Sequence, residues 1–227
     1  MKKKVISAII AALALALLAA MLSGCGKKNT AANTAEPASA DASAATAEPA
    51  GSSEAEIVTA RQDGERFEET IILEGMEETV HYEHIRNDTV GIEMDYDYES
   101  FVRLHESEWE RFFSIYDNEQ NPENFLELTR STSNADVIAA SVRASLSQEY
   151  KLLEDTRTLD RAGSCIRIEA SEHKDGGRMA EKPQVVYIIP ASDGCLVAIE
   201  HFSIESAEGF GRRFSYMLNT LSVIDRK

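Results

Sequence analysis

The sequence predicts an α+β domain in which helices pack on an antiparallel β-sheet. Two β-rich runs, residues 185–189 and 195–199, are separated by a turn that carries Ser192-Asp193-Gly194. Two other segments have apolar residues at helical spacing. Consecutive strands joined by short turns pair antiparallel, and amphipathic helices bury their apolar stripes against such a sheet. These observations define the fold class.

Strands are predicted first in the N-terminal half of the domain, at residues 67–73, 80–86 and 90–96. Asn87-Asp88 forms a tight turn between the last two. Residues 109–116 and 125–129 are weaker strand candidates. The stretch 101–116 also has apolar residues near helical spacing, so the pattern leaves strand and helix open there.

Two helices follow from apolar stripes. Residues 133–136, Ser-Asn-Ala-Asp, resemble a capping box that opens a helix to about Tyr150. Its stripe consists of Ile138, Val142 and Leu146. Ser206 is the predicted cap of a second helix, whose stripe consists of Phe210, Phe214, Met217 and Leu221. Such stripes indicate core packing rather than contact with a cofactor.

The C-terminal half predicts three consecutive antiparallel strands. Residues 165–170 alternate between an apolar and a charged face, and Asp175-Gly176-Gly177 then turns the chain into the strand at 185–189. The hairpin formed by 185–189 and 195–199 is apolar on both faces. We therefore expect it in the centre of a sheet that is covered on both sides.

The N-terminus has the layout of a secretory signal, with three lysines followed by an apolar run of 18 residues from Val5 to Leu22. The alternative is a transmembrane helix, for which this length is just sufficient. An ordinary signal peptidase site needs small residues at both the first and third positions before the cut. Gly24 fits this rule and Leu22 does not.

Leu22-Ser23-Gly24-Cys25 instead resembles the lipobox of bacterial lipoproteins, and all four positions match. The resemblance implies that the Cys25 thiol receives a diacylglyceryl group through a thioether and that the chain is cut before Cys25. Two acyl chains suffice for stable anchoring. Gly26 stands where an Asp would mark retention at an inner membrane. Whether the host has one or two membranes stays open.

Three regions follow along the chain: a signal peptide at 1–24, a lipidated linker at 25–56 and a single domain at 57–227. The linker consists mainly of Ala, Thr, Ser, Glu and Pro, and the pentapeptide at 34–38 recurs at 46–50. Such a segment buries too little apolar surface to offset its conformational entropy, so we expect disorder.

The charge balance excludes several partners. The chain has 23 basic and 39 acidic residues. Removal of the signal takes away three lysines and leaves 20 against 39, a net charge of −19. A surface of this sign does not bind nucleic acid or adhere to anionic lipid headgroups.

A family resemblance covers most of residues 67–225. The strands from Gly163 onward, followed by GFGRRFSYMLNTLSVID, are similar to the C-terminal half of PsbP-like domains. The segments ILEGMEETV and MDYDYESF are similar to the opening hairpins of bacterial members. The resemblance implies a non-enzymatic binding or assembly module. Members bind different partners, so no site residues carry over.

Cys165 and Cys195 are the thiols that remain after lipidation. If their strands flank the strand at 185–189, two strand spacings separate them by roughly 9.5 Å. This exceeds the limit of roughly 7 Å between Cα atoms for a disulfide. We expect buried free thiols, although a different strand order would allow a disulfide.

Metal and catalytic motifs are weak throughout. His81 and His84 are three residues apart, so on a strand they point to opposite faces and do not share an ion. The run 95–99, with Glu106 at the twelfth position, resembles a calcium loop, but Ser100 replaces the required glycine. No nucleophile elbow or phosphate-binding glycine loop occurs. The sequence predicts no catalytic residue, metal or cofactor.

The sequence thus predicts a lipid-anchored module on the extracytoplasmic face of a bacterial membrane. Its partners would be membrane lipid, through acylated Cys25, and an envelope protein or a cell-wall component. Trp109, Phe112 and Phe113 are the candidate residues for an exposed partner surface. One alternative is a small-molecule or metal binder that serves a transporter. Another is an envelope enzyme without a recognisable motif.

Overall fold

The computed structural model describes residues 61–73, 75–106 and 108–226. The predicted signal peptide, lipobox, Cys25 and linker lie outside the described residues. Within the described part of the chain, no helix is long and apolar enough to cross a membrane.

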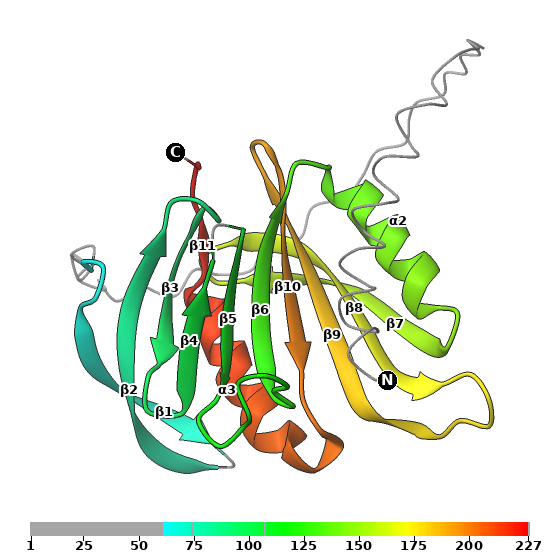
Figure 1. Cartoon of the computed structure of the whole chain (residues 1–227), viewed down its shortest axis with the longest axis horizontal. Coiled ribbons are helices and arrows are strands. Elements are labelled where there is room, and N and C mark those ends of the chain that lie inside the picture. The colour runs from blue at the N-terminus through cyan, green and yellow to red at the C-terminus, as the bar shows by residue number, and fades with distance from the viewer. Residues whose placement is uncertain (1–60, 74, 107, 227) are drawn as a thin grey trace, which may run out of the picture. The chain divides into compact units, whose positions relative to one another are not determined.

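The strands form two antiparallel sheets (Figure 1). A four-stranded sheet has the order β1 (Arg66–Leu73), β2 (Met76–Asn87), β3 (Ile92–Asp97) and β11 (Ser222–Val223). A seven-stranded sheet has the order β4 (Phe101–His105), β5 (Trp109–Ser114), β6 (Phe125–Ser131), β10 (Gly194–His201), β9 (Met179–Ala191), β8 (Gly163–His173) and β7 (Tyr150–Leu159). The helices are α2 (Ala135–Leu146), the short 3-10 helix η1 (Ile204–Ser206) and α3 (Ala207–Thr220).

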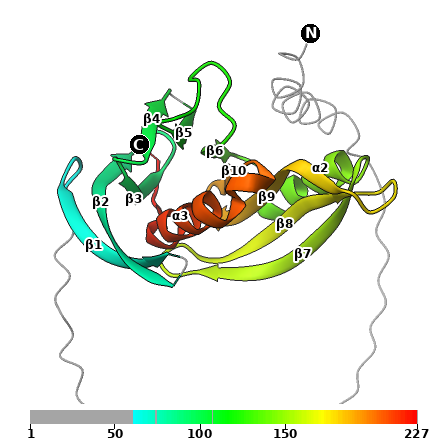
Figure 2. The same ribbon diagram turned by 90° about the horizontal axis from the view of Figure 1, so that it is seen from below.

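Helix α3 packs against β3 of one sheet and β7 of the other (Figure 2). Both sheets contribute side chains to the main core cluster. From the helix, this cluster includes Phe214, Met217 and Leu218, and from just after it Leu221. Helix α2 contacts β7, β8 and β9 and buries Ile138, Ala139, Val142 and Leu146. The predicted fold class, an antiparallel sheet with helices packed on it, is confirmed.

Strand alternation directs successive residues of β9 to different faces of the sheet. Tyr187 and Ile189 belong to the cluster that contains α3, whereas Val186 and Ile188 are buried outside it. The hairpin of β9 and β10 lies inside the seven-stranded sheet, as its apolar character on both faces predicts.

Two local predictions need correction, and the choice left open for residues 101–116 is resolved in favour of strands. Helix α2 is capped by Asn134, whose side chain accepts a hydrogen bond from the Val137 amide (2.9 Å), and not by Ser133. The helix ends at Leu146, and Tyr150 already begins β7. The stretch 101–116 is not helical but forms β4 and β5, because β5 pairs with strands on both sides.

The polar run at 95–99 fastens α3 to the four-stranded sheet. Arg213 Nη1 on α3 donates to Asp97 Oδ2 (2.6 Å), and its Nη2 donates to Glu78. Thr220 Oγ1 accepts a hydrogen bond from the Asp95 amide (2.9 Å). Both aspartates lie on β3 and are buried. Of the acidic residues that suggested a calcium loop, Asp97 therefore holds α3 through its carboxylate and Asp95 through its backbone amide.

Gly91 sits where the turn between β2 and β3 meets the C-terminal segment. Its φ is +78°, its amide donates to Asn87 (2.8 Å), and its carbonyl accepts from the Ile224 amide (2.9 Å). A Cβ at this position would lie 2.7 Å from the Ile224 carbonyl oxygen. Gly91 is thus required both for its backbone angle and for the close approach of the chain end.

We expect G91A to destabilise the fold more than G163A. Gly163 has nearly the same φ, +79°, but nothing lies within 4 Å of its position for a Cβ. Both variants introduce left-handed strain, and only G91A adds a collision with backbone. Urea titration measures the free energy of unfolding of each variant. The loss relative to the wild type should be larger for G91A than for G163A by about 1–3 kcal/mol. Equal losses would mean that the contact with Ile224 is unimportant.

Candidate functional site

A pocket of about 290 Å³ lies beside the turn between β9 and β10. Its walls come from the end of β6, the turn between β7 and β8, and the C-terminal segment around β11. Two arginines, Arg130 and Arg161, line it together with Ser192 and Asp225. Segments far apart in the sequence therefore build a basic pocket in a strongly acidic chain.

Arg130 is the buried cation of this pocket. It lies on β6 opposite Leu196, on the inward face of the sheet, and its side chain is only 2% exposed. Its Nε donates to Asp193 Oδ1 (3.1 Å), and Nη2 donates to the same oxygen. Nη1 is buried and has no hydrogen-bond partner among the described residues. A buried guanidinium with an unsatisfied N–H is energetically unfavourable until an acceptor reaches it.

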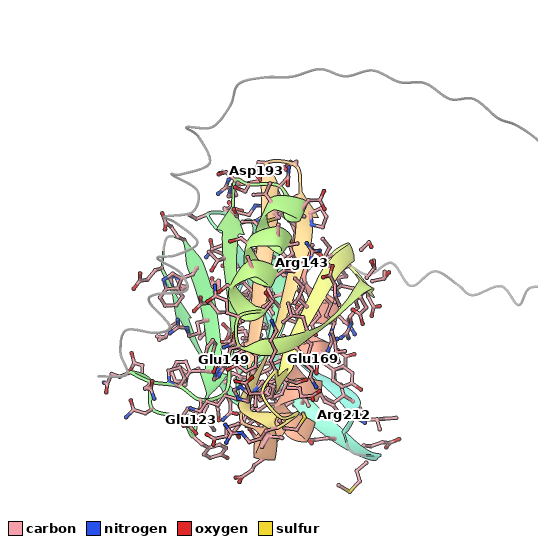
Figure 3. All side chains as sticks on the ribbon, turned by 90° about the vertical axis from the view of Figure 1, so that its right-hand side faces the viewer. Glu123, Arg143, Glu149, Glu169, Asp193 and Arg212 are labelled. Carbon is pink, nitrogen blue, oxygen red and sulfur yellow. The ribbon has the colours of Figure 1, made fainter. Side chains whose placement is uncertain are left out.

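Asp193 holds two arginines at the tip of the hairpin between β9 and β10, where Figure 3 places it. Besides Arg130, it accepts a hydrogen bond from Arg226 Nε through Oδ2 (2.7 Å). Hydrogen bonds from Arg130 and then Arg226 lower the pKa of this carboxyl group. Asp193 therefore stays ionised and fixes the orientation of the Arg130 side chain.

Arg161 is held more loosely than Arg130. Its side chain is 41% exposed, and its closest ion-pair partner is Asp95 Oδ2, 4.0 Å away. Ser192 Oγ donates to Asp225 Oδ1 (2.8 Å), which occupies both groups with each other. Ala162, Pro190, Ala191, Val223 and Ile224 supply apolar wall. The arrangement offers cationic donors to a small ligand with an apolar part.

These site residues were missed from the sequence because they form no motif. Arg130, Arg161 and Arg226 come from three separate segments. One signal was available: Leu126, Leu128 and Arg130 alternate along one strand, so a charged residue continues an apolar face. Such a position indicates a buried cation with a specific partner.

A second ionisable cluster lies on the same inward face. Glu200 on β10 is 3% exposed, and its Oε1 has no hydrogen-bond partner within the described chain. Burial raises the pKa of Glu200 to about 8, against smaller opposite effects of Arg157 and Arg167. Burial likewise raises the pKa of the Tyr187 hydroxyl to about 12. Both side chains are almost fully enclosed, and neither lines the pocket that Arg130 lines.

We expect E200Q to remove a pH dependence of stability. An acid whose pKa is near 4.5 unfolded and about 8 folded keeps its proton in the native state, so stability falls as pH rises through this interval. E200Q stays neutral at every pH. Compared with the wild type, it should gain at least about 1.4 kcal/mol, the equivalent of one pKa unit, between pH 5 and pH 8.

Urea unfolding at the two pH values measures this gain. The exposed substitution E119Q serves as the control and should leave the difference between pH 5 and pH 8 as in the wild type. If E200Q and the wild type lose stability in parallel, Glu200 is already ionised in the fold.

The predicted partner surface is wrong for two of its three residues. Phe112 and Phe113 are buried, at 0% and 3% exposure. Phe112 packs against Tyr96 in the main core, with ring centroids 5.1 Å apart. Because adjacent residues of a strand point to opposite faces, the burial of both shows that β5 is covered on both faces here. Trp109 is half-buried, and the Arg111 guanidinium lies 5.0 Å from its ring centroid.

The two histidines have separate partners, as their spacing predicts. His81 Nδ1 lies 3.0 Å from a Glu99 oxygen, and its Nε2 lies 3.2 Å from a Glu68 oxygen. His84 Nδ1 lies 2.6 Å from Asp95 Oδ1 in the interior. Nowhere in the described part of the chain do three metal-ligating side chains gather.

Cys165 and Cys195 are free and buried, as predicted. They lie on β8 and β10, which flank β9. The register aligns Cys165 with Ile189 of β9 and Cys195 with Pro190 of β9. Because Ile189 and Pro190 are adjacent in the strand, the two cysteines lie on opposite faces of the sheet. Burial raises the pKa of both thiols, that of Cys195 to about 11. Neither thiol is suited to act as a nucleophile.

Comparison with protein families and with curated proteins gives no match. Several solved structures are similar. The Ran-binding protein Mog1p of Saccharomyces cerevisiae is 11% identical, with a TM-score of 0.41 over 64% of this chain and 97% of Mog1p. PsbP of the cyanobacterium Synechocystis is 9% identical, with a TM-score of 0.41 over 63% of this chain and 92% of PsbP.

LpqN of Mycobacterium tuberculosis, a protein involved in cell envelope biogenesis, is 10% identical, with a TM-score of 0.39 over 70% of this chain and 91% of LpqN. These likenesses concern the arrangement of strands and helices. They transfer no ligand, partner or site residue to this chain.

Proposed function

We propose that this chain is a lipid-anchored, extracytoplasmic binding module without catalytic activity. The observation that carries the anchor is the Leu22-Ser23-Gly24-Cys25 motif directly after an 18-residue apolar run. The low-complexity stretch at 25–56 then separates Cys25 from the compact unit that begins at Arg61. A domain on such a tether acts at the membrane surface on an envelope protein or a cell-wall component.

The residues around the pocket support binding rather than catalysis. Its described lining contains two arginines, two serines and one aspartate, and no histidine, cysteine or lysine. Ser192 donates directly to Asp225, without the intervening base that activates a serine nucleophile. Glu200 and Tyr187, whose pKa values are shifted, are enclosed in the core. Guanidinium groups at a pocket instead favour recognition of an anion.

The pocket also favours a second candidate, a small-molecule binder that serves a transporter. Its volume of about 290 Å³ lies just below the range, roughly 300–1,000 Å³, of ligand pockets and suits a small ligand. A protein partner would need a larger surface than this hollow provides. For a metal ion as the bound small molecule, the described residues contain no cluster of three or more metal-ligating side chains.

Substitution of Cys25 tests the anchor. The full-length wild type, expressed in a bacterium fed an alkyne fatty acid, should incorporate the label and sediment with membranes. C25S lacks the thiol that accepts the diacylglyceryl group, so it should lose the label completely and retain the mass of its uncleaved signal. Mass spectrometry and in-gel fluorescence measure both effects.

C165S is the matched control because it removes a thiol from the folded domain, and it should label like the wild type. Acylation of C25S, or an unlabelled wild type, would contradict the proposed anchor.

A further inference from the structure

We propose that the pocket beside Arg130 binds a small monocarboxylate with a short apolar body. This inference rests on the proposed binding role and names its ligand class. The geometry that points to it is a buried guanidinium whose terminal nitrogen Nη1 is unpaired, set in a pocket that also has an exposed arginine and an apolar wall.

The first step concerns Arg130 Nη1. The guanidinium has only donors and stays charged at every physiological pH, so only an acceptor satisfies it. Asp193 occupies Nε and Nη2 from one side and leaves Nη1 without a partner in the described chain. A Cβ placed on Gly91 would lie 3.4 Å from Nη1, which shows how closely the backbone already encloses it. A compact acceptor such as a carboxylate oxygen fits this setting.

The second step concerns local charge. Arg130 and Arg226 share the single carboxylate of Asp193, and Arg161 lies 4.0 Å from its closest carboxylate. Asp225 is engaged by Ser192. Because Arg161 shares Asp95 with Arg61, the four guanidinium groups of this set outnumber its three carboxylates, Asp95, Asp193 and Asp225. One additional negative charge balances the group, and Arg161 is free to supply a second donor to the ligand.

The third step distinguishes carboxylate from phosphate. A phosphate has more acceptor oxygens and needs several donor groups, whereas the unpaired donors of Arg130 here are the two N–H groups of the single nitrogen Nη1. Half of the described lining is apolar, and Pro190, Val223 and Ile224 are part of it. This surface suits a short hydrocarbon body next to the charge. The carboxylate comes either from a free acid or from the C-terminus of a peptide.

The test uses the full-length chain in detergent and ligand-observed NMR titration with four probes: butyrate, acetyl-alanyl-alanine, the amide of the same dipeptide, and inorganic phosphate. The key variant is R161Q. Its control is R143Q, because the Arg143 side chain on α2 is also 41% exposed. Its loss removes the same charge at an ion pair with Glu154, and neither residue lines the pocket.

We expect the wild type and R143Q to bind butyrate or the dipeptide acid with the same dissociation constant, and R161Q to bind about tenfold more weakly. Binding of butyrate assigns a free acid, and binding of the dipeptide acid alone assigns a peptide terminus. The amide should not bind. R130K, which keeps the charge but loses the fork, should weaken binding as well, with circular dichroism confirming that it is folded.

Three results overturn the inference: no binding of either acid to the folded wild type at 20-fold excess over millimolar protein (about 20 mM), equal affinity of R161Q and R143Q, or tighter binding of phosphate. In the first case water alone satisfies Arg130. None of these results affects acylation of Cys25, and loss of acylation in C25S leaves carboxylate binding intact, so the two proposals fail separately.

Discussion

Helix α3 is the element on which the rest of the structure depends, because it joins two sheets that share no strand pairing in the described chain. Phe214, Met217 and Leu218 are fully buried, and each such side chain contributes about 1.5–3 kcal/mol by leaving water. Arg213 pairs with buried Asp97. Removing one partner of such a pair leaves an uncompensated charge, so the ion pair sets where the helix docks.

The position of α3 also determines the pocket. The chain leaves the helix at Leu221 and immediately forms β11, which pairs with β3. The Ile224 amide then binds the Gly91 carbonyl, and residues 222–225 become one wall of the pocket. Arg130 lies on β6 and Asp193 in the turn between β9 and β10, and these strands belong to the seven-stranded sheet. The pocket is therefore a consequence of how the two sheets meet, and neither sheet contains it alone.

The sequence predicted those elements whose pattern reflects their own burial. The hairpin of β9 and β10 is apolar on both faces because α2 and α3 cover it, and the stripe of α3 is apolar because it fills the core. Strand β7 was missed because it is an edge strand, rich in exposed charged residues, and pairs only with β8. Its place depends on its neighbour more than on its own residues.

The prediction of the partner surface was wrong because the burial of its residues also depends on neighbouring elements. Phe112 and Phe113 lie in a stretch where helix and strand were both open, and their burial on opposite faces of β5 comes from tertiary packing that the local pattern does not show. The arginines of the pocket escaped prediction because long-range contacts bring them together. A charged residue that continues an apolar strand face, such as Arg130, was the one local sign of the site.

Asp95 links this pocket to the start of the described chain. Its carboxylate lies 2.6 Å from His84 Nδ1 and 3.2 Å from Arg61 Nη1, while Arg161 is 4.0 Å away. Because Asp95 already has two closer partners in the interior, it holds Arg161 only weakly. The weak contact leaves the Arg161 guanidinium available to an incoming anion, whereas Arg130 is fixed by Asp193. The pocket thus combines one buried arginine, held in place by Asp193, with one exposed arginine, held by a long contact to Asp95.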